Sequence, residues 1–157
     1  MSDEVTLFTL PRGATGFRDR HDDPLPETDR SAFRTALHAA ARAGGARVRE
    51  VTEQRYPRNY HSATVTDRAG EWTVLCHLHH PWIAFADELR DVGVSGFVAP
   101  PGWTAAFSDA GFTVLGAGLL MSPLSTVDTS ALTAFDRDEI RHHRAGTVGD
   151  VLFNSWD

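Results

Sequence analysis

Residues 60–79, which read YHSATVTDRAGEWTVLCHLH, decide the fold of this chain. Two runs rich in Val, Thr and aromatic residues flank the turn sequence at 67–70, the pattern of an antiparallel hairpin. A four-residue turn would place Tyr60 opposite His77, and it would set the pairing of every other position. In the same register Ser62 faces Leu75 and Thr64 faces Thr73.

Alternation along this hairpin sorts its side chains onto two faces. The first face is apolar and predicts a core: Ala63, Val65, Trp72, Val74, Cys76 and Leu78. The second face is polar, and we expect it to be open to solvent: Tyr60, Ser62, Thr64, Thr66, Thr73, His77 and His79. His61 and His80 fall on the core side near the strand ends, where a ring can still reach solvent or a backbone carbonyl.

Residues before the hairpin predict one more strand and one helix. Residues 46–54 read as a strand that makes the hairpin a three-stranded meander. A helix is expected over 31–43, with Asp29 or Ser31 as its cap and Gly44 at its end. Residues 5–10 suggest a short strand, and 11–28, rich in Asp, Arg, Gly and Pro, predict a long mobile loop.

Residues after the hairpin predict a strand–helix–strand unit and two short helices. Residues 82–92 fit either a helix or a strand. A strand at 94–99, a helix from Pro100 and a strand at 112–115 suggest a parallel crossover. Two capping boxes then predict the terminal helices: Asp136 with Glu139, and Thr147 with Asp150. The aromatic tail, with Phe153 and Trp156, is expected to pack on the body of the protein.

Together these segments predict one α+β domain over residues 1–157. Its sheet is mixed and mainly antiparallel, with an N-terminal helix, a strand–helix–strand unit and two short C-terminal helices. A chain of 157 residues is long enough to bury one core without disulfides or bound metal.

Composition narrows the possible partners and surroundings. The formal net charge is -6, and all 15 basic residues are Arg. This balance disfavours a general nucleic-acid binder, which neutralises phosphates with clustered basic residues, and a basic partner is easier to accommodate. A lone cysteine, an N-terminus without a basic and apolar leader, and short apolar segments predict a cytoplasmic protein that does not enter membranes.

Candidate chemistry centres on His77, His79 and Tyr60. Two histidines at alternate strand positions lie about 7 Å apart on one face, so they could share a zinc ion. A third ligand from His21, Asp22 or Asp23 would be needed. Without a metal, a Tyr60 hydroxyl across from His77 could take part in acid–base catalysis. The catalytic candidates are therefore Tyr60, His77 and His79, and the metal candidates are His77 and His79.

Function is predicted mainly from what surrounds this cluster. No P-loop, dinucleotide fingerprint, Gly-x-Ser-x-Gly elbow or His-Glu-x-x-His helix occurs, so no cofactor is expected beyond a metal. Several Trp residues lie beside Pro or Gly, and Trp, Tyr and Arg dominate protein interfaces. A small acidic domain of this kind resembles, in general character and without a shared motif, the bacterial immunity proteins of toxin systems. We expect a partner-binding protein, such as an immunity or accessory factor. The alternative is a small enzyme or small-molecule-binding domain that uses the Tyr/His cluster on the open sheet face.

Overall fold

One five-stranded sheet organises the protein, for which the computed structural model describes residues 7–89 and 93–157. Its strands follow chain order. The first four pair antiparallel and the last pair is parallel, so the expected mixed, mainly antiparallel sheet is confirmed. The strands are β1 (Arg47–Thr52), β2 (Tyr60–Asp67), β3 (Gly70–His77), β4 (Trp82–Ala86) and β5 (Thr113–Val114).

The hairpin formed by β2 and β3 has the register that the turn length predicts. Tyr60 pairs with His77, Ser62 with Leu75 and Thr64 with Thr73. Asp67 accepts hydrogen bonds from the backbone N–H groups of Ala69 and Gly70, and this Asx-type contact closes the turn. The turn therefore fixes which side chains share a face.

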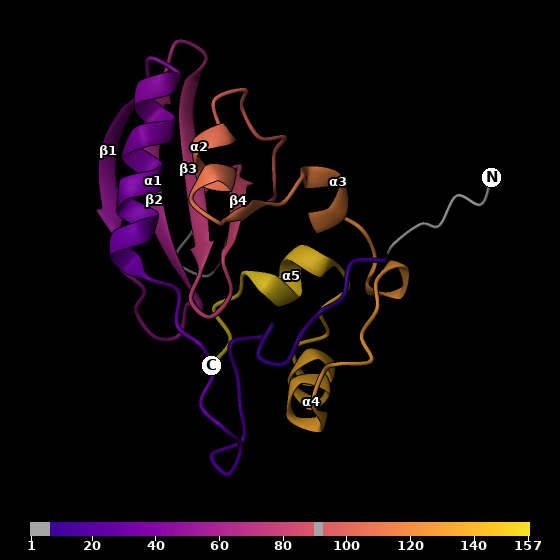
Figure 1. Ribbon diagram of the computed structural model, residues 1–157. Coiled ribbons are helices and arrows are strands. Elements are labelled where there is room, and N and C mark those ends of the chain that lie inside the picture. Colours follow the sequence, from indigo (N-terminus) through magenta and orange to yellow (C-terminus); the bar gives the residue numbers. More distant parts are fainter. Residues whose placement is uncertain (1–6, 90–92) are drawn as a thin grey trace, which may run out of the picture.

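Two helices cover the apolar face of the sheet (Figure 1). The helix α1 (Arg30–Ala43) begins at Asp29, whose carboxylate accepts from the N–H groups of Ser31 and Ala32, and it ends at Gly44. The helix α2 (Ala105–Asp109) packs beside it. The buried side chains between these helices and the sheet include Phe33, Leu37, Val65, Val74, Cys76, Ile83, Phe85 and Phe107.

The opposite face of the sheet was expected to be open, and this expectation is wrong at the end that carries Tyr60 and His77, while Thr64 and Thr66 on the same face are half-buried. Tyr60 is 1% exposed, and Leu75 and His77 are fully buried. They belong to a second core that is completed by residues far away in the sequence. Its other members include Leu10, Ala14, Trp82, Leu120, Val148, Val151, Leu152 and Phe153. The sheet thus separates two cores.

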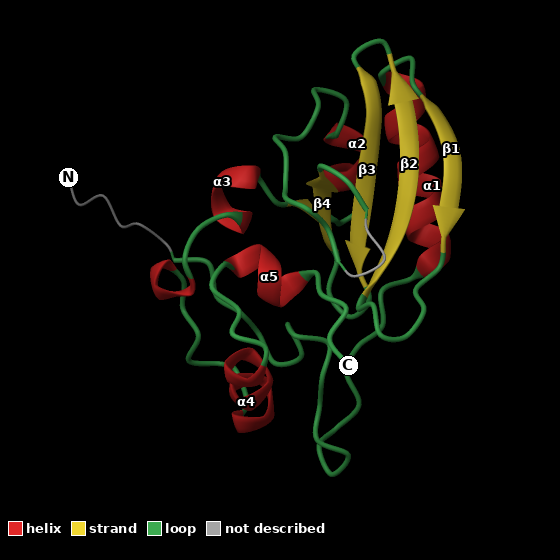
Figure 2. Cartoon of the chain, turned by 180° about the vertical axis from the view of Figure 1, so that it is seen from behind, coloured by secondary structure: helices red, strands yellow, loops and turns green. Residues whose placement is uncertain are grey.

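The C-terminal half supplies most of this second core, and Figure 2 shows its helices on the β4 side of the sheet. Its helices are α3 (Ala117–Leu120), the 3-10 helix η1 (Leu124–Thr126), α4 (Ala134–His142) and α5 (Val148–Leu152). The capping box of Thr147 with Asp150 is confirmed. The box of α4 is formed by Thr133 with Asp136, where the sequence suggested Asp136 with Glu139, because the threonine hydroxyl takes the N-cap position.

The strand–helix–strand unit is present, but its first strand is β4. Residues 82–86 form that strand and α2 follows it, before β5 pairs parallel to it. Val94 and Phe97 make only isolated bridges, to Leu89 and Ala86. Of the short strand expected at 5–10, Thr9 makes one bridge with Asp128, and residues 5–6 lie outside the described residues, as do 90–92.

No helix among the described residues combines the length and apolar character needed to cross a bilayer.

Candidate functional site

His77, the central candidate from the sequence, lies inside the second core with both ring nitrogens engaged. Its Nδ1 accepts the backbone N–H groups of His79, at 3.0 Å, and His80, at 3.1 Å. The Nε2 atom therefore carries the proton and donates to the carbonyl of Ala14 at 3.0 Å. Burial lowers the pKa of His77 to about 3, because the charged ring would lose its hydration. His77 is a neutral structural residue at physiological pH.

His79 and His80 continue the same pattern and hold the N-terminal loop. Nδ1 of His79 contacts the carbonyl of Pro26 at 2.8 Å, and Nε2 of His80 contacts that of Arg12 at 3.1 Å. Thr28 donates from its N–H to the carbonyl of Leu78. The histidine cluster (His77, His79 and His80) thus fastens both ends of the loop at 11–28. Whether the middle of this loop is mobile stays a prediction.

Tyr60 lies across the hairpin from His77, as predicted, but it is not at a surface. Its ring packs against Phe153, with the ring centroids 6.2 Å apart, and its hydroxyl lies beside Ser155 without hydrogen-bond geometry. Burial raises the pKa of Tyr60. Acid–base catalysis by Tyr60, His77 and His79 remains a prediction, but the open sheet face on which it depended is enclosed.

A metal at His77 and His79 would require His77 to give up hydrogen bonds. The two ring centroids are 6.0 Å apart, yet both nitrogens of His77 already serve the backbone. Within 7–89 and 93–157, no group of three His, Cys, Asp or Glu side chains has the arrangement of a metal site. Burial raises the pKa of Cys76 to about 12, so this thiol stays protonated, as its place in the core predicts.

A second candidate lies where the C-terminal segments meet, and we call it the C-terminal pocket. It has a volume of about 400 Å³, within the range of small-molecule sites. Its walls are residues 93–97, the end of α4, the start of α5 and the tail at 153–156. A Cβ on Gly149 would lie 2.3 Å from the Phe97 ring, so glycine is needed for this ring to rest on α5. The apolar lining comprises Val94, Phe97, Met121, Ala145 and Phe153.

Most polar side chains of the C-terminal pocket are already committed to the fold. The carboxylate of Asp150 accepts from the N–H groups of Gly146 and Thr147. The Asn154 amide donates to the carbonyls of Thr15 and Val151. The Ser155 hydroxyl oxygen accepts the N–H of Gly93. These contacts tie the three side chains to the fold and shape the pocket.

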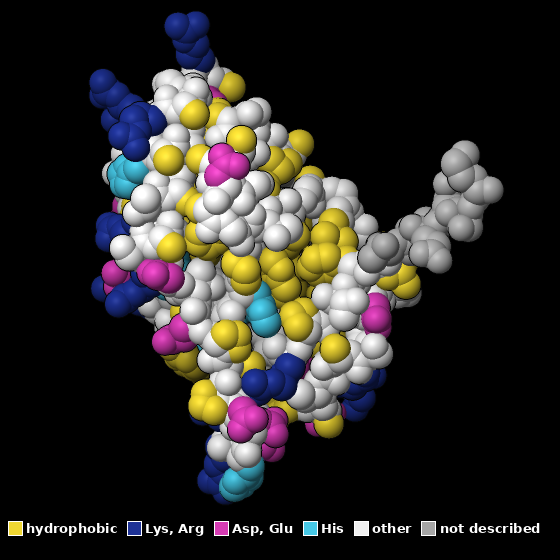
Figure 3. Space-filling view, in the orientation of Figure 1, with side chains coloured by type: hydrophobic (Ala, Val, Ile, Leu, Met, Phe, Trp, Pro, Cys, Tyr) yellow, Lys and Arg dark blue, Asp and Glu magenta, His cyan; other side chains and the backbone are white. Residues whose placement is uncertain are grey.

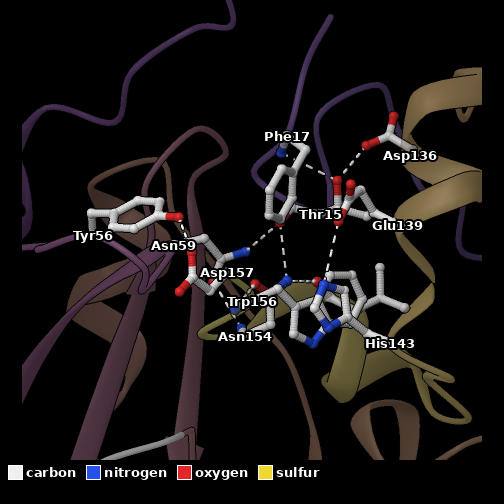
Figure 4. A network of polar contacts seen from close by, with 11 residues as sticks. Thr15, Phe17, Tyr56, Asn59, Asp136, Glu139, His143, Asn154, Trp156 and Asp157 are labelled. Atoms are coloured by element: carbon white, nitrogen blue, oxygen red, sulfur yellow. Dashed lines mark hydrogen bonds and ion pairs between the residues drawn. The ribbon is translucent and has the colours of Figure 1, made fainter.

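His143 closes one side of the pocket through a stack of three rings (Figure 4). Its imidazole lies parallel to Trp156, with centroids 4.7 Å apart and an angle of 8°. Trp156 also stacks with Phe17 from the N-terminal loop, with centroids 6.4 Å apart and an angle of 28°. Nε2 of His143 lies 3.3 Å from a carboxylate oxygen of Glu139, one turn earlier in α4. The expected packing of the aromatic tail on the protein body is confirmed.

Arg144 differs from the three side chains that hydrogen bonds tie to the fold. Its side chain is exposed and has no hydrogen bond or ion pair among the described residues. Its backbone has φ 53°, the left-handed region, immediately after the C-cap of α4. Glycine usually occupies this position, and another residue costs about 1–2 kcal/mol there. An arginine is therefore held beside the pocket at some expense of stability.

Sequence reasoning missed this pocket for identifiable reasons. The tail was recognised as unusual and Thr147 as a helix cap, but the segment at 93–97 and the end of α4 are distant in sequence from the tail. Arginine and histidine side chains near the end of a helix are commonly explained by the helix dipole. Only the presence of arginine, and not glycine, directly after the helix could have signalled a special position.

Comparisons with protein-family models, with curated proteins and with solved structures find no match for this chain.

Proposed function

We propose that this protein is a non-catalytic binding protein that takes the carboxylate end of a partner polypeptide into the C-terminal pocket. The observation that carries the proposal is Arg144, an unpaired guanidinium beside a pocket whose other polar groups mostly serve the fold. Guanidinium groups bind carboxylates with two parallel hydrogen bonds. The half-apolar lining would receive the last side chain of the partner.

The charge distribution on the surface is consistent with binding of a single carboxylate at Arg144. The face drawn in Figure 3 shows arginines and acidic residues scattered around its periphery, with apolar side chains gathered in its middle. The chain as a whole carries -6, so an extended acidic partner would be repelled. A single carboxylate at a chain end, placed against Arg144, avoids this repulsion.

Binding without catalysis is the action expected of an immunity or accessory factor, and we include this role in the proposal. Support comes from the committed polar groups of the pocket, since a catalytic site needs a nucleophile or base free to act. We also propose a cytoplasmic setting, which the free buried thiol of Cys76 suits.

The test is calorimetry with a panel of short peptides that differ only in an apolar last residue. Each peptide is compared with its C-terminal amide. We expect at least one free-acid peptide to bind, and its amide to bind about tenfold more weakly, as for loss of one charge-assisted pair. Arg144→Gln should weaken binding similarly. Arg141→Gln, which removes an exposed arginine of the same helix, is the matched control.

Two outcomes would overturn the proposal. Equal affinities for acid and amide would show that no carboxylate is recognised. Binding of free hexanoate as tightly as of the best peptide would mean that the pocket serves a small carboxylate and no partner protein is involved.

A further inference from the structure

A separate pocket lies between the start of α1 and the end of β1, on the opposite side of the hairpin from Tyr60. Its volume is about 420 Å³, and Glu27, Arg30, Glu53, Gln54 and His61 contribute to its lining. We call it the His61 pocket. Its ligand chemistry can be derived from one buried ring and the charges around it, independently of the function proposed above.

His61 presents a buried hydrogen-bond donor that has no acceptor. The residue is 3% exposed, and its Nδ1 accepts the backbone N–H of Gln54 at 2.9 Å. A neutral imidazole that accepts at Nδ1 carries its proton on Nε2. That Nε2 atom has no hydrogen-bond partner. Since buried donors in proteins are almost always paired, this orphaned N–H needs an explanation.

The ring is held in place and kept neutral. It stacks on Phe33 of α1, with centroids 6.3 Å apart and an angle of 21°. Burial is the main cause that lowers the pKa of His61, and Arg30 lowers it further, while Glu53 and Glu27 oppose this shift. All three charged side chains therefore act on the ring from the rim of the same pocket.

The rim offers one carboxylate without a partner. Arg30 is paired with Glu53 at 2.8 Å, which leaves this pair close to neutral. Glu27 is exposed and makes no hydrogen bond or ion pair with any residue in the described ranges. The pocket thus combines a negative charge at its rim with the buried, neutral ring of His61 among its lining residues.

We propose that the His61 pocket binds a small organic cation that also carries an acceptor oxygen, such as a guanidinium or ammonium compound with a carbonyl. The cation pairs with Glu27, and the oxygen accepts the hydrogen bond from Nε2 of His61. A metal ion does not suit this wall, because the protonated Nε2 has no lone pair to donate. The long exposed side chains at the rim can rearrange around the bound molecule.

The experiment uses N-acetyl-L-argininamide, which holds a guanidinium and carbonyl oxygens in one molecule, at pH 7. Its binding is followed by NMR of the full chain, through the ring nitrogens of His61 and the backbone amide of Gln54. We expect saturable shifts at both. Methylguanidine, which lacks the carbonyl, and N-acetyl-L-norleucinamide, which lacks the cation, should each bind about tenfold more weakly.

Glu27→Gln tests the charge at the rim. This variant should bind N-acetyl-L-argininamide about fivefold to tenfold more weakly. Glu71→Gln removes the same charge from an exposed position outside the pocket and should bind like the parent protein. No saturable shift at His61 would overturn the proposal, and so would equal affinities of the two variants. Peptide binding in the C-terminal pocket should be unaffected by Glu27→Gln, so failure of one proposal is distinguishable from failure of the other.

Discussion

Two histidines, His77 and His143, occupy opposite situations in this protein. His77 belongs to the conspicuous run of histidines, is fully buried and uses both ring nitrogens for backbone contacts. His143 belongs to no functional motif of the sequence, yet it borders a pocket. Its Nε2 lies near Glu139, and its ring lies on Trp156. The difference teaches that a cluster of histidines indicates many hydrogen-bonding groups. The fold can use these groups to hold its own loops, without any ligand.

Replacing His77 should have the largest effect on stability and is therefore the strongest test of this contrast. His77→Ala leaves two N–H groups and the Ala14 carbonyl unpaired and creates a cavity, so we expect a loss of about 4 kcal/mol in the free energy of unfolding. His77→Asn keeps an acceptor at the position of Nδ1 and should lose about half as much. Urea denaturation measures both. If His143→Ala cost more than His77→Ala, the assignment of His77 as the structural member would be wrong.

Acid should destabilise the folded protein mainly through protonation of His77. In the unfolded chain a histidine binds a proton near pH 6.5, whereas His77 in the folded protein does so only near pH 3. Its contribution to stability is therefore complete above pH 6.5 and is lost as the pH falls from 6.5 towards 3. We expect a decrease of about 2–3 kcal/mol between pH 6.5 and 4.5.

Urea titrations at several pH values can measure this slope. His61 and His80, whose pKa values burial also lowers, act in the same direction. His77→Asn must therefore flatten the pH dependence without removing it. An unchanged slope in that variant would show that His77 is not the main group titrating.

Arg144 allows stability and binding to be separated beside His143. Arg144→Gly relieves the left-handed backbone and should raise the free energy of unfolding by about 1 kcal/mol, while peptide binding weakens at least about tenfold. Arg144→Gln keeps the backbone strain and removes only the charge, so it should bind the peptide about tenfold more weakly at unchanged stability. Thermal and urea unfolding, run with the calorimetry, compare the pair. Lower stability of the glycine variant would contradict the interpretation of φ 53° as strain.

The smallest effect is expected at His143 itself. His143→Phe preserves the ring stack on Trp156 but removes the contact with Glu139, and even a fully formed ion pair at such a partly exposed position contributes about 0.5 kcal/mol or less. Stability should thus hardly change in urea. A loss comparable to that of His77→Asn would show that both histidines are structural and would remove the contrast between the two regions.

Local sequence rules were sufficient to predict the helices and strands and the register of the hairpin. The turn at 67–70 fixed the pairing of Tyr60 with His77, and Asp29 marked the start of α1. Both signals lie within a few residues of the structure they specify. The uncertain segment after Pro81 became a strand because β3 offers it a partner edge, which a short apolar run does not reveal by itself.

Local sequence rules did not predict which segments cover the polar face of the sheet. Side-chain alternation assigns residues to faces, but it does not say which distant segment lies over each face. Tyr60, Ser62 and His77 look like surface residues, yet Ala14 and Phe153 meet two of them in the core. The candidate site was misplaced for that reason, since its openness was inferred from polarity alone.

Hydrogen bonds join early segments of the chain to late ones, and this has a consequence for folding during synthesis. The backbone N–H of Leu10 donates to the carbonyl of Asp128, the Thr15 hydroxyl donates to the Asp136 carboxylate, and Asn59 exchanges hydrogen bonds with Asn154. A ribosome emits the hairpin and α1 long before these partners appear, so the early layer must wait with one side uncovered. During synthesis that side stays exposed, and the second core can close only after residues 128–154 have emerged from the ribosome.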